Sequence, residues 1–165
     1  MDVIQDKVFR NEHVRMNTSS IYVRNAIEDA TKKPRPNEVD WPPAVTGELG
    51  LYRENLLLHQ PRLLFAFGAF AYEFARRANG ENPERMYLYW RATRLGEEFR
   101  RKVEAFDSTG INAFPLLHVS IARGRFIQAH DYFCDSEGAN YFEYAGKAIA
   151  SLLLEHSSTL QVWIS

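Results

Sequence analysis

The sequence predicts a single α/β domain of the doubly wound kind, with three α/β/α layers in which helices cover both faces of a mostly parallel sheet. One observation is that short apolar segments of strand length alternate with segments of helical periodicity. Another is that 165 residues suit one domain with a proper core. Hydrophobic residues make up 45% of the chain and charged residues 25%, which is ordinary globular usage.

The first third of the chain predicts two helices, a strand and a loop. Residues 2–10 have helical character, and β-branched and aromatic side chains predict a strand over 20–27. The stretch 28–43 is rich in proline, which removes a backbone donor, so we expect an irregular surface loop. A helix then follows, with Thr46 as its cap and Pro61 as its stop.

The middle of the chain predicts a buried strand between helices. The run 62–67 is continuously apolar and ends at Gly68, as expected for a parallel strand that is buried on both faces. A helix follows at once. Asn82, with Pro83 and an acidic residue after it, predicts the start of a long helix that reaches about Phe106.

The last third predicts two further strands around a helix. Residues 111–118 form the third strand candidate and lead into a loop with a histidine and two arginines. Asn140 and Glu143 have the spacing of a capping box, which begins a helix. The residues 159–164 alternate like a final strand.

Composition excludes several classes of function. The apolar runs are far shorter than the roughly 20 residues that span a bilayer, and the chain begins without the basic and apolar stretches of a secretory signal, so we expect a cytoplasmic protein. Cys134 is the only cysteine, so we expect neither an internal disulfide nor a thiolate metal site. The net charge of −1 offers no global attraction to nucleic acid.

Three residues stand where predicted strands end, the edge at which ligands bind in open parallel sheets. His118 has an imidazole suited to proton transfer or to oxyanion stabilisation, and Asn25 has an amide suited to bidentate recognition. Gly68 ends the strand between them. Structural roles are the alternative, with the histidine bonded to a backbone carbonyl and the asparagine capping a turn. The other histidines have no metal-ligand spacing, and no phosphate-binding glycine pattern occurs, so we expect no metal and no cofactor.

Three stretches resemble the uracil-DNA glycosylase superfamily, closest to its thermostable bacterial and archaeal branch, over roughly residues 3–154. The first is a strand ending in a base-reading asparagine, followed by a proline-rich loop: Tyr22-Val23-Arg24-Asn25-Ala26-Ile27 and Lys33-Pro34-Arg35-Pro36-Asn37-Glu38. The second is a proline-basic-apolar strand and glycine turn: Gln60-Pro61-Arg62-Leu63-Leu64-Phe65-Ala66-Phe67-Gly68. The third is the strand that ends in histidine, where Val119 replaces the usual proline: Pro115-Leu116-Leu117-His118-Val119-Ser120.

The resemblance implies an enzyme that flips a damaged base out of DNA, reads its edge and cleaves its glycosidic bond. It implies that Asn25 reads the uracil edge, beside Gly68, and that His118 stabilises negative charge on the departing base. It further implies that Ser120, Arg123 and Arg125 contact the DNA around the flipped nucleotide.

The chain departs from the family in two places. Nothing in residues 1–24 resembles the family's first motif, which positions the attacking water, and the four cysteines of the iron-sulfur cluster are not present. We therefore expect a single glycosylase-like domain, 1–165, shortened at the N-terminus, with weak or lost hydrolysis. The alternative is a noncatalytic nucleic-acid or protein interaction domain on the same fold. A second copy, a partner chain or the segment 159–164 is expected to complete the sheet.

Overall fold

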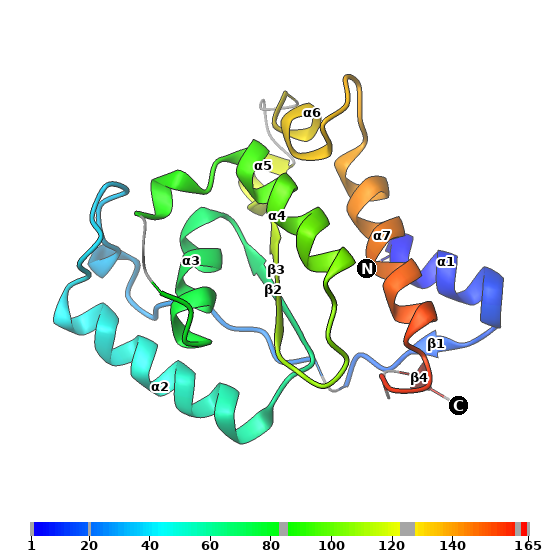
Figure 1. Cartoon of the computed structure of the whole chain (residues 1–165), viewed down its shortest axis with the longest axis horizontal. Helices are drawn as coiled ribbons and strands as arrows, with labels where there is room; N and C mark the ends of the chain where they lie inside the picture. Colours follow the sequence, from blue (N-terminus) through cyan, green and yellow to red (C-terminus); the bar gives the residue numbers. More distant parts are fainter. Residues whose placement is uncertain (1, 20, 83–85, 123–127, 161–162, 165) are drawn as a thin grey trace.

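A computed structural model of the chain has mixed α/β architecture, with helices around a small parallel sheet (Figure 1). The structure describes residues 2–19, 21–82, 86–122, 128–160 and 163–164. The α/β class that the sequence predicts is confirmed in this coarse form. Within the described ranges, no helix is long and apolar enough to cross a membrane.

The parallel sheet consists of β2 (Leu63–Phe67) and β3 (Asn112–Leu116). Leu63 lies opposite Asn112, and Phe67 lies opposite Leu116. The strands predicted over 62–67 and 111–118 are thus confirmed. Every residue of β3 is buried, as the apolar sequence of that strand requires.

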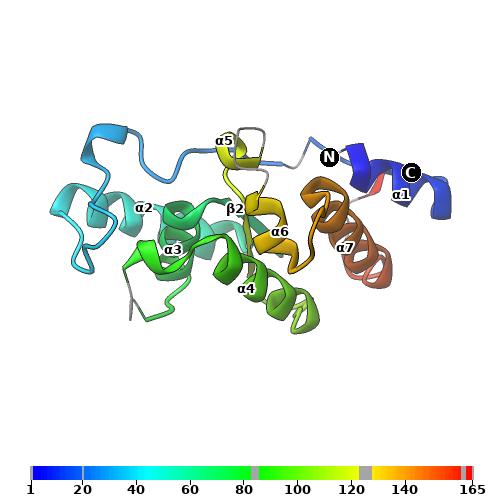
Figure 2. The same cartoon turned by 90° about the horizontal axis from the view of Figure 1, so that it is seen from above.

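Two helices connect these strands and pack against them. Helix α3 (Ala69–Ala78) starts directly after β2, and α4 (Ala92–Glu104) leads to β3. Figure 2 shows α3 and α4 on one side of the strands, while the segment between β1 and η1 crosses on the other side. The Phe114 ring of β3 packs against the rings of Phe65, in a tilted pair, and Phe99, edge to face, at centroid distances of 5.7 and 6.4 Å. These aromatic contacts join the sheet to α4.

The long helix predicted from Asn82 is wrong in its first half. Residues 83–85 lie outside the described ranges, a short 3-10 helix η2 spans Tyr87–Tyr89, and α4 starts at Ala92. Two buried aromatic side chains explain the difference. The Tyr87 hydroxyl donates to the Pro34 carbonyl at 3.0 Å, and the Trp90 indole donates to Glu73 at 2.7 Å. These long-range bonds hold a tight turn where local propensity favours a helix.

The strand predicted over 20–27 is also wrong, because residues 21–27, the described part of this segment, are coil. Ile21, Tyr22 and Val23 are 49%, 79% and 84% exposed, and a strand without a partner gains nothing from its propensity. The segment is fixed by side chains instead. Ile27 packs into a second core cluster between α2 and α3, together with Trp41, Val45, Phe70, Phe74 and Tyr87.

Helix α2 (Pro43–His59) begins three residues before the predicted cap. Proline at the first helical position needs no hydrogen-bond partner, and the Thr46 hydroxyl donates back to the Pro43 carbonyl at 3.0 Å. Thr46 is therefore not the cap. The helix ends at His59, and Gln60, with φ of 42°, is its C-cap directly before Pro61, the predicted stop.

The two ends of the chain meet beside the larger core. Helix α1 (Asp2–Glu12) packs against α7 (Tyr141–Glu155), and Asn140 caps α7 by accepting from the amides of Phe142 and Glu143. Within the predicted final strand 159–164, residues 161–162 lie outside the described ranges, and β4 (Trp163–Ile164) pairs antiparallel with β1 (Arg15–Met16). Figure 1 places this pair beside α1, in a sheet separate from β2 and β3, so β4 does not extend the parallel sheet. The remaining elements are η1 (Ala30–Lys32), α5 (Val119–Ala122) and α6 (Gln128–Cys134).

Candidate functional site

The carboxyl ends of β2 and β3 bring Gly68 and His118 into direct contact. The Gly68 amide donates to the Leu116 carbonyl at 2.7 Å, and a Cβ atom added to Gly68 would lie 3.0 Å from the His118 Cβ. Gly68 also has φ of 93°, in the region that favours glycine. The turn therefore requires glycine, and the imidazole sits against its backbone.

The histidine ring is held by Ser120, two residues further along. The Ser120 amide donates to His118 Nδ1 at 3.2 Å, and the Ser120 Oγ lies 2.7 Å from the same nitrogen. A backbone amide can only donate, so Nδ1 is the acceptor and a neutral ring carries its proton on Nε2. The residue is exposed, and within the described ranges no hydrogen bond occupies Nε2. The site thus offers an N–H donor to the outside.

Two anchors fix this donor in position. The His118 carbonyl accepts from the amides of Ile121 and Ala122, which starts α5. On the strand side, the Leu117 amide donates to the buried Tyr141 hydroxyl at 3.0 Å. Burial raises the pKa of Tyr141 to about 12, so this hydroxyl stays protonated at neutral pH. The backbone on both sides of the imidazole is therefore set by the fold.

Helix α3 adds a second set of donors beside the imidazole. Gly68 caps this helix and has no side chain to accept from the first-turn amides. Unpaired amides give a helix start a partial positive charge, which favours an oxygen that carries negative charge. Next to Gly68 and His118 in the chain, the apolar side chains of Phe67, Val119 and Ile121 are exposed by 48%, 50% and 36%. The arrangement suits a flat molecule with a carbonyl or anionic oxygen.

The other predicted site residues do not join this group. Asn25 is exposed on the coil, and its backbone carbonyl accepts from the Arg24 guanidinium at 2.9 Å. Its predicted place at a strand end is wrong, because residues 21–27 form no strand. Figure 1 shows this segment crossing near the amino ends of the strands, whereas α5 follows a carboxyl end. Arg123 and Arg125 lie outside the described ranges.

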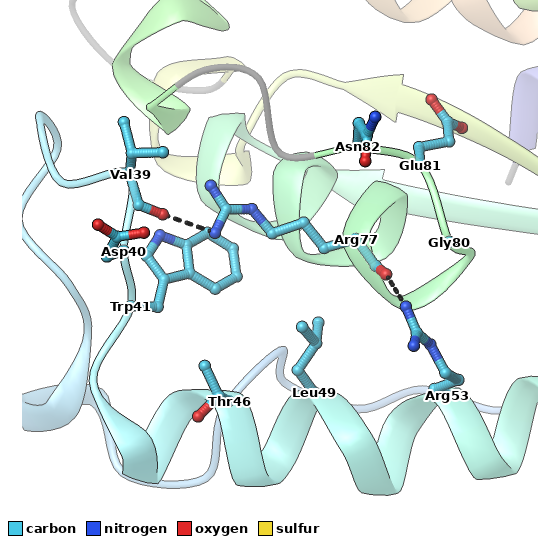
Figure 3. A pocket seen from close by; sticks show the side chains of 10 residues that line it. All are labelled: Val39, Asp40, Trp41, Thr46, Leu49, Arg53, Arg77, Gly80, Glu81 and Asn82. Atoms are coloured by element: carbon cyan, nitrogen blue, oxygen red, sulfur yellow. Dashed lines mark hydrogen bonds between the residues drawn. The ribbon is translucent and has the colours of Figure 1, made fainter.

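Away from this edge, a hollow lies between α2, α3 and the loop at residues 39–41, with a volume of about 370 Å³ (Figure 3). The Arg77 guanidinium stacks 3.8 Å above the Trp41 ring and donates to the Val39 carbonyl at 2.8 Å. Arg53 donates to the Arg77 carbonyl, also at 2.8 Å. The hollow is lined by Val39, Asp40, Trp41, Thr46, Leu49, Arg53, Arg77, Gly80, Glu81 and Asn82.

Arg77, one of the two arginines that line this hollow, belongs to a buried ionic cluster around Glu73. Glu73 is 0% exposed and accepts from Arg77 at 2.9 Å, from Arg76 at 3.0 Å and from the Trp90 indole at 2.7 Å. Sequence reasoning missed this cluster. Its signal was one glutamate on the apolar face of a helix, with arginines three and four residues later. Because its donors already bond to protein, the cluster is structural.

The buried cysteine offers no chemistry at neutral pH. Burial raises the pKa of Cys134 to about 11, so little thiolate is present. Within the described ranges, no three side chains of histidine, cysteine, aspartate or glutamate gather as a metal site would require. Comparisons of the chain with protein-family models, with curated proteins and with solved structures give no match.

Proposed function

We propose that the carboxyl edge of β2 and β3 recognises uracil or a damaged base flipped out of DNA, as a uracil-DNA glycosylase does. The carrying observation is the Ser120 amide on Nδ1 of His118, which leaves Nε2–H to donate to a carbonyl oxygen of the base. The amino end of α3 supports the same oxygen. The exposed apolar side chains of Phe67, Val119 and Ile121 would give the base a surface on which to pack.

The chemistry follows from where charge develops. When the bond between the sugar C1′ and the base nitrogen breaks, its electron pair stays on the base, and negative charge spreads to the carbonyl oxygens. A water adds at C1′ and releases a proton. Donors placed at the developing charge lower the barrier, and one such donor is typically worth about 100- to 1,000-fold in rate. Weak or lost hydrolysis stays part of the proposal, since nothing in residues 1–24 resembles the family motif that positions the attacking water.

Other predicted residues enter through the resemblance alone. In this proposal Ser120, Arg123 and Arg125 meet the DNA backbone around the flipped nucleotide. Asn25 would read the base edge, and Asn25→Asp tests that role, because a carboxylate lacks the amide's donor. Weaker binding of uracil DNA is the expected result, and unchanged binding removes Asn25 from the site.

The three-layer arrangement and the partner chain belong to the same proposal. The Arg62 carbonyl and the Gly68 amide form hydrogen bonds with β3. Because alternate residues of a strand bond to opposite neighbours, the backbone N–H and C=O groups of Leu63, Phe65 and Phe67 point to the outer edge of β2. On β3 the outward position is Pro115, which has no amide to donate. A strand from a second copy or another chain would therefore pair with the outer edge of β2. The proposal also keeps the expected cytoplasmic location.

The deciding experiment measures abasic sites after incubation with single- and double-stranded DNA containing uracil. We expect slow release, and we expect His118→Ala to reduce it at least about 100-fold without changing the fold. His59→Ala, which removes an exposed histidine at the end of α2, is the matched control. If no abasic sites form at a stoichiometric amount of protein, the proposal that the protein is an enzyme is wrong.

A noncatalytic interaction domain is the second candidate, favoured by the net charge of −1 and by the exposed side chains of Ile21, Tyr22 and Val23. Fluorescence anisotropy with the same DNA separates the two kinds of partner. Salt-sensitive binding without turnover supports a nucleic-acid module. No binding at low salt indicates a protein partner.

A further inference from the structure

Helix α5, which directly follows His118, is too short to be stable by itself. It spans only Val119–Ala122, whereas isolated helices shorter than about 12 residues are marginal in water. This short helix nevertheless contains the Ser120 amide that donates to His118 Nδ1 at 3.2 Å. Contacts from outside α5 must therefore keep it formed, because the imidazole otherwise loses the bond that sets its tautomer.

A histidine of the next helix bonds to the last residue of α5. His130 belongs to α6, and its Nε2 lies 2.8 Å from the Ala122 carbonyl oxygen. Ala122 is buried, and the last carbonyls of a helix have no partner within the helix itself. A carbonyl can only accept, so this bond requires a proton on Nε2 of His130. The side chain of His130 thus satisfies a buried acceptor at the end of α5.

Helix α6 is itself fixed to the core of the molecule. The Arg100 guanidinium of α4 donates to the Phe133 carbonyl at 2.9 Å, and a Cβ atom added to Gly96 would overlap the same carbonyl. The backbones of α4 and α6 are therefore in direct contact. Figures 1 and 2 both show α6 next to α5, and the two helices are in contact. The bond from His130 consequently ties α5 to a rigid support.

A neighbouring ring anchors the other side of His118. The His130 ring packs against the Tyr141 ring at a centroid distance of 5.6 Å. The Tyr141 hydroxyl accepts from the amide of Leu117, the residue directly before His118. Two adjoining rings thus hold the backbone at Leu117 and at Ala122, and the imidazole of His118 lies between these two points.

We propose that His130 is a positioning residue for His118. The Nε2–H of His130 keeps α5 formed, α5 keeps the Ser120 amide on Nδ1 of His118, and His118 therefore keeps its own proton on the outward Nε2. His130 bonds to α5 and acts on a bound base only through His118. A role for this bond in catalysis rests on the proposed function, whereas its effect on the His118 ring exists without any ligand.

Nitrogen-15 NMR of the imidazole rings tests the proposal without DNA. At about pH 8, above the usual titration range of histidine, the wild type should show an unprotonated Nδ1 and a protonated Nε2 in both His118 and His130. His130→Phe keeps a ring against Tyr141 but removes the donor. In this variant His118 should show a mixture of the two tautomers. The amides of Ile121 and Ala122 should also exchange about 2- to 10-fold faster relative to those of β3, as the loss of one hydrogen bond predicts.

Two further variants separate the hydrogen bond from packing. His130→Gln replaces Nε2 by an amide nitrogen that can donate, so it should restore the wild-type tautomer of His118 and the wild-type exchange rates. His156→Phe is the matched control. His156 is half-buried like His130 and packs on Phe106 at 4.7 Å, but within the described ranges its ring forms no hydrogen bond. This control should leave the His118 ring unchanged.

The wild-type spectrum can overturn the proposal without any variant: a His130 ring with its proton on Nδ1 does so. A His130→Phe protein in which His118 keeps the wild-type tautomer overturns it too, even if exchange is faster, because a merely structural bond would have that effect.

The assay of abasic sites separates this proposal from the proposed function. If the wild type releases uracil, His130→Phe should slow the release about 2- to 10-fold, and an unchanged rate overturns the role of His130 in catalysis. If the wild type releases no uracil, the enzymatic proposal is wrong, and the NMR result alone decides whether His130 positions His118.

Discussion

The Glu73 cluster and the His118 edge are both built from polar side chains, but they differ in where the hydrogen bonds go. Glu73 is 0% exposed, and its carboxylate accepts from two arginines and a tryptophan. His118 is exposed, and its bonds to protein stop at Nδ1. A polar group that is saturated by the protein stabilises the fold, while one with an outward donor is available to a ligand. The predictions below test this distinction through the cost of removing each group.

Glu73→Ala should have the largest effect. Two guanidinium groups would stay buried beside a missing carboxylate, and breaking one side of a buried ion pair typically costs about 3–5 kcal/mol. Urea unfolding measures this loss. Glu97→Ala is the control, since Glu97 pairs with Arg94 at 2.7 Å while both side chains are about half exposed, and such pairs contribute about 0–1 kcal/mol. Equal losses in the two variants would contradict the structural role of the cluster.

Gly68→Ala should have the second largest effect, because the edge around His118 depends on backbone geometry. The added Cβ meets the histidine Cβ at 3.0 Å, and φ of 93° strains any residue with a side chain. We expect about 1–3 kcal/mol of destabilisation and a displaced imidazole. Gly50→Ala in the open part of α2 should instead be neutral or stabilising by up to about 1 kcal/mol. A Gly68→Ala protein with the same free energy of unfolding as the wild type would show that the turn does not fix the position of the imidazole.

The sequence predicted those elements whose information is local. The strands at 62–67 and 111–118 are continuous apolar runs, and the asparagine cap of α7 depends on neighbours within three residues. The same strands locate Gly68 and His118, so their contact at one edge follows from the parallel pairing.

The elements that failed depend on distant partners. Residues 20–27 have strand propensity, but Ile27 is held by the cluster around Trp41, and no periodicity reports that contact. Helix α4 starts late because Tyr87 and Trp90 bond to Pro34 and Glu73. One missed signal was readable: Pro115 inside a strand argues for an edge position rather than the centre of a sheet.

Asn140→Ala should have a smaller effect than either buried change. Its side-chain oxygen accepts from the amides of Phe142 at 3.1 Å and Glu143 at 3.3 Å, and the residue is exposed at the surface. Loss of such a cap typically costs about 1 kcal/mol. Asn55→Ala, at an exposed position inside α2, should leave the free energy of unfolding nearly unchanged. If Asn140→Ala lost as much free energy of unfolding as Glu73→Ala, burial would not determine how much each polar group contributes to stability.

The smallest effect should come from protonating Glu98, whose partners are unevenly exposed. Its carboxylate accepts from the buried Tyr72 hydroxyl at 2.7 Å and from Arg101, which is 58% exposed. Burial works to raise the pKa of Glu98, but the hydrogen bonds from Arg101 and Tyr72 outweigh it and hold the pKa below its ordinary value of 4.5.

A carboxyl whose pKa is lowered by folding binds fewer protons in the native state than in the unfolded state. Its contribution to stability is therefore fully present above about pH 4.5 and is lost as the pH falls through the folded pKa. Urea unfolding of the wild type and of Glu98→Gln between pH 7 and pH 3 measures it. We expect a small difference in the free energy of unfolding at pH 7, which shrinks as the pH falls below 4.5. A difference that stays constant with pH would show that Glu98 acts through shape, and that its ionised hydrogen bonds contribute nothing.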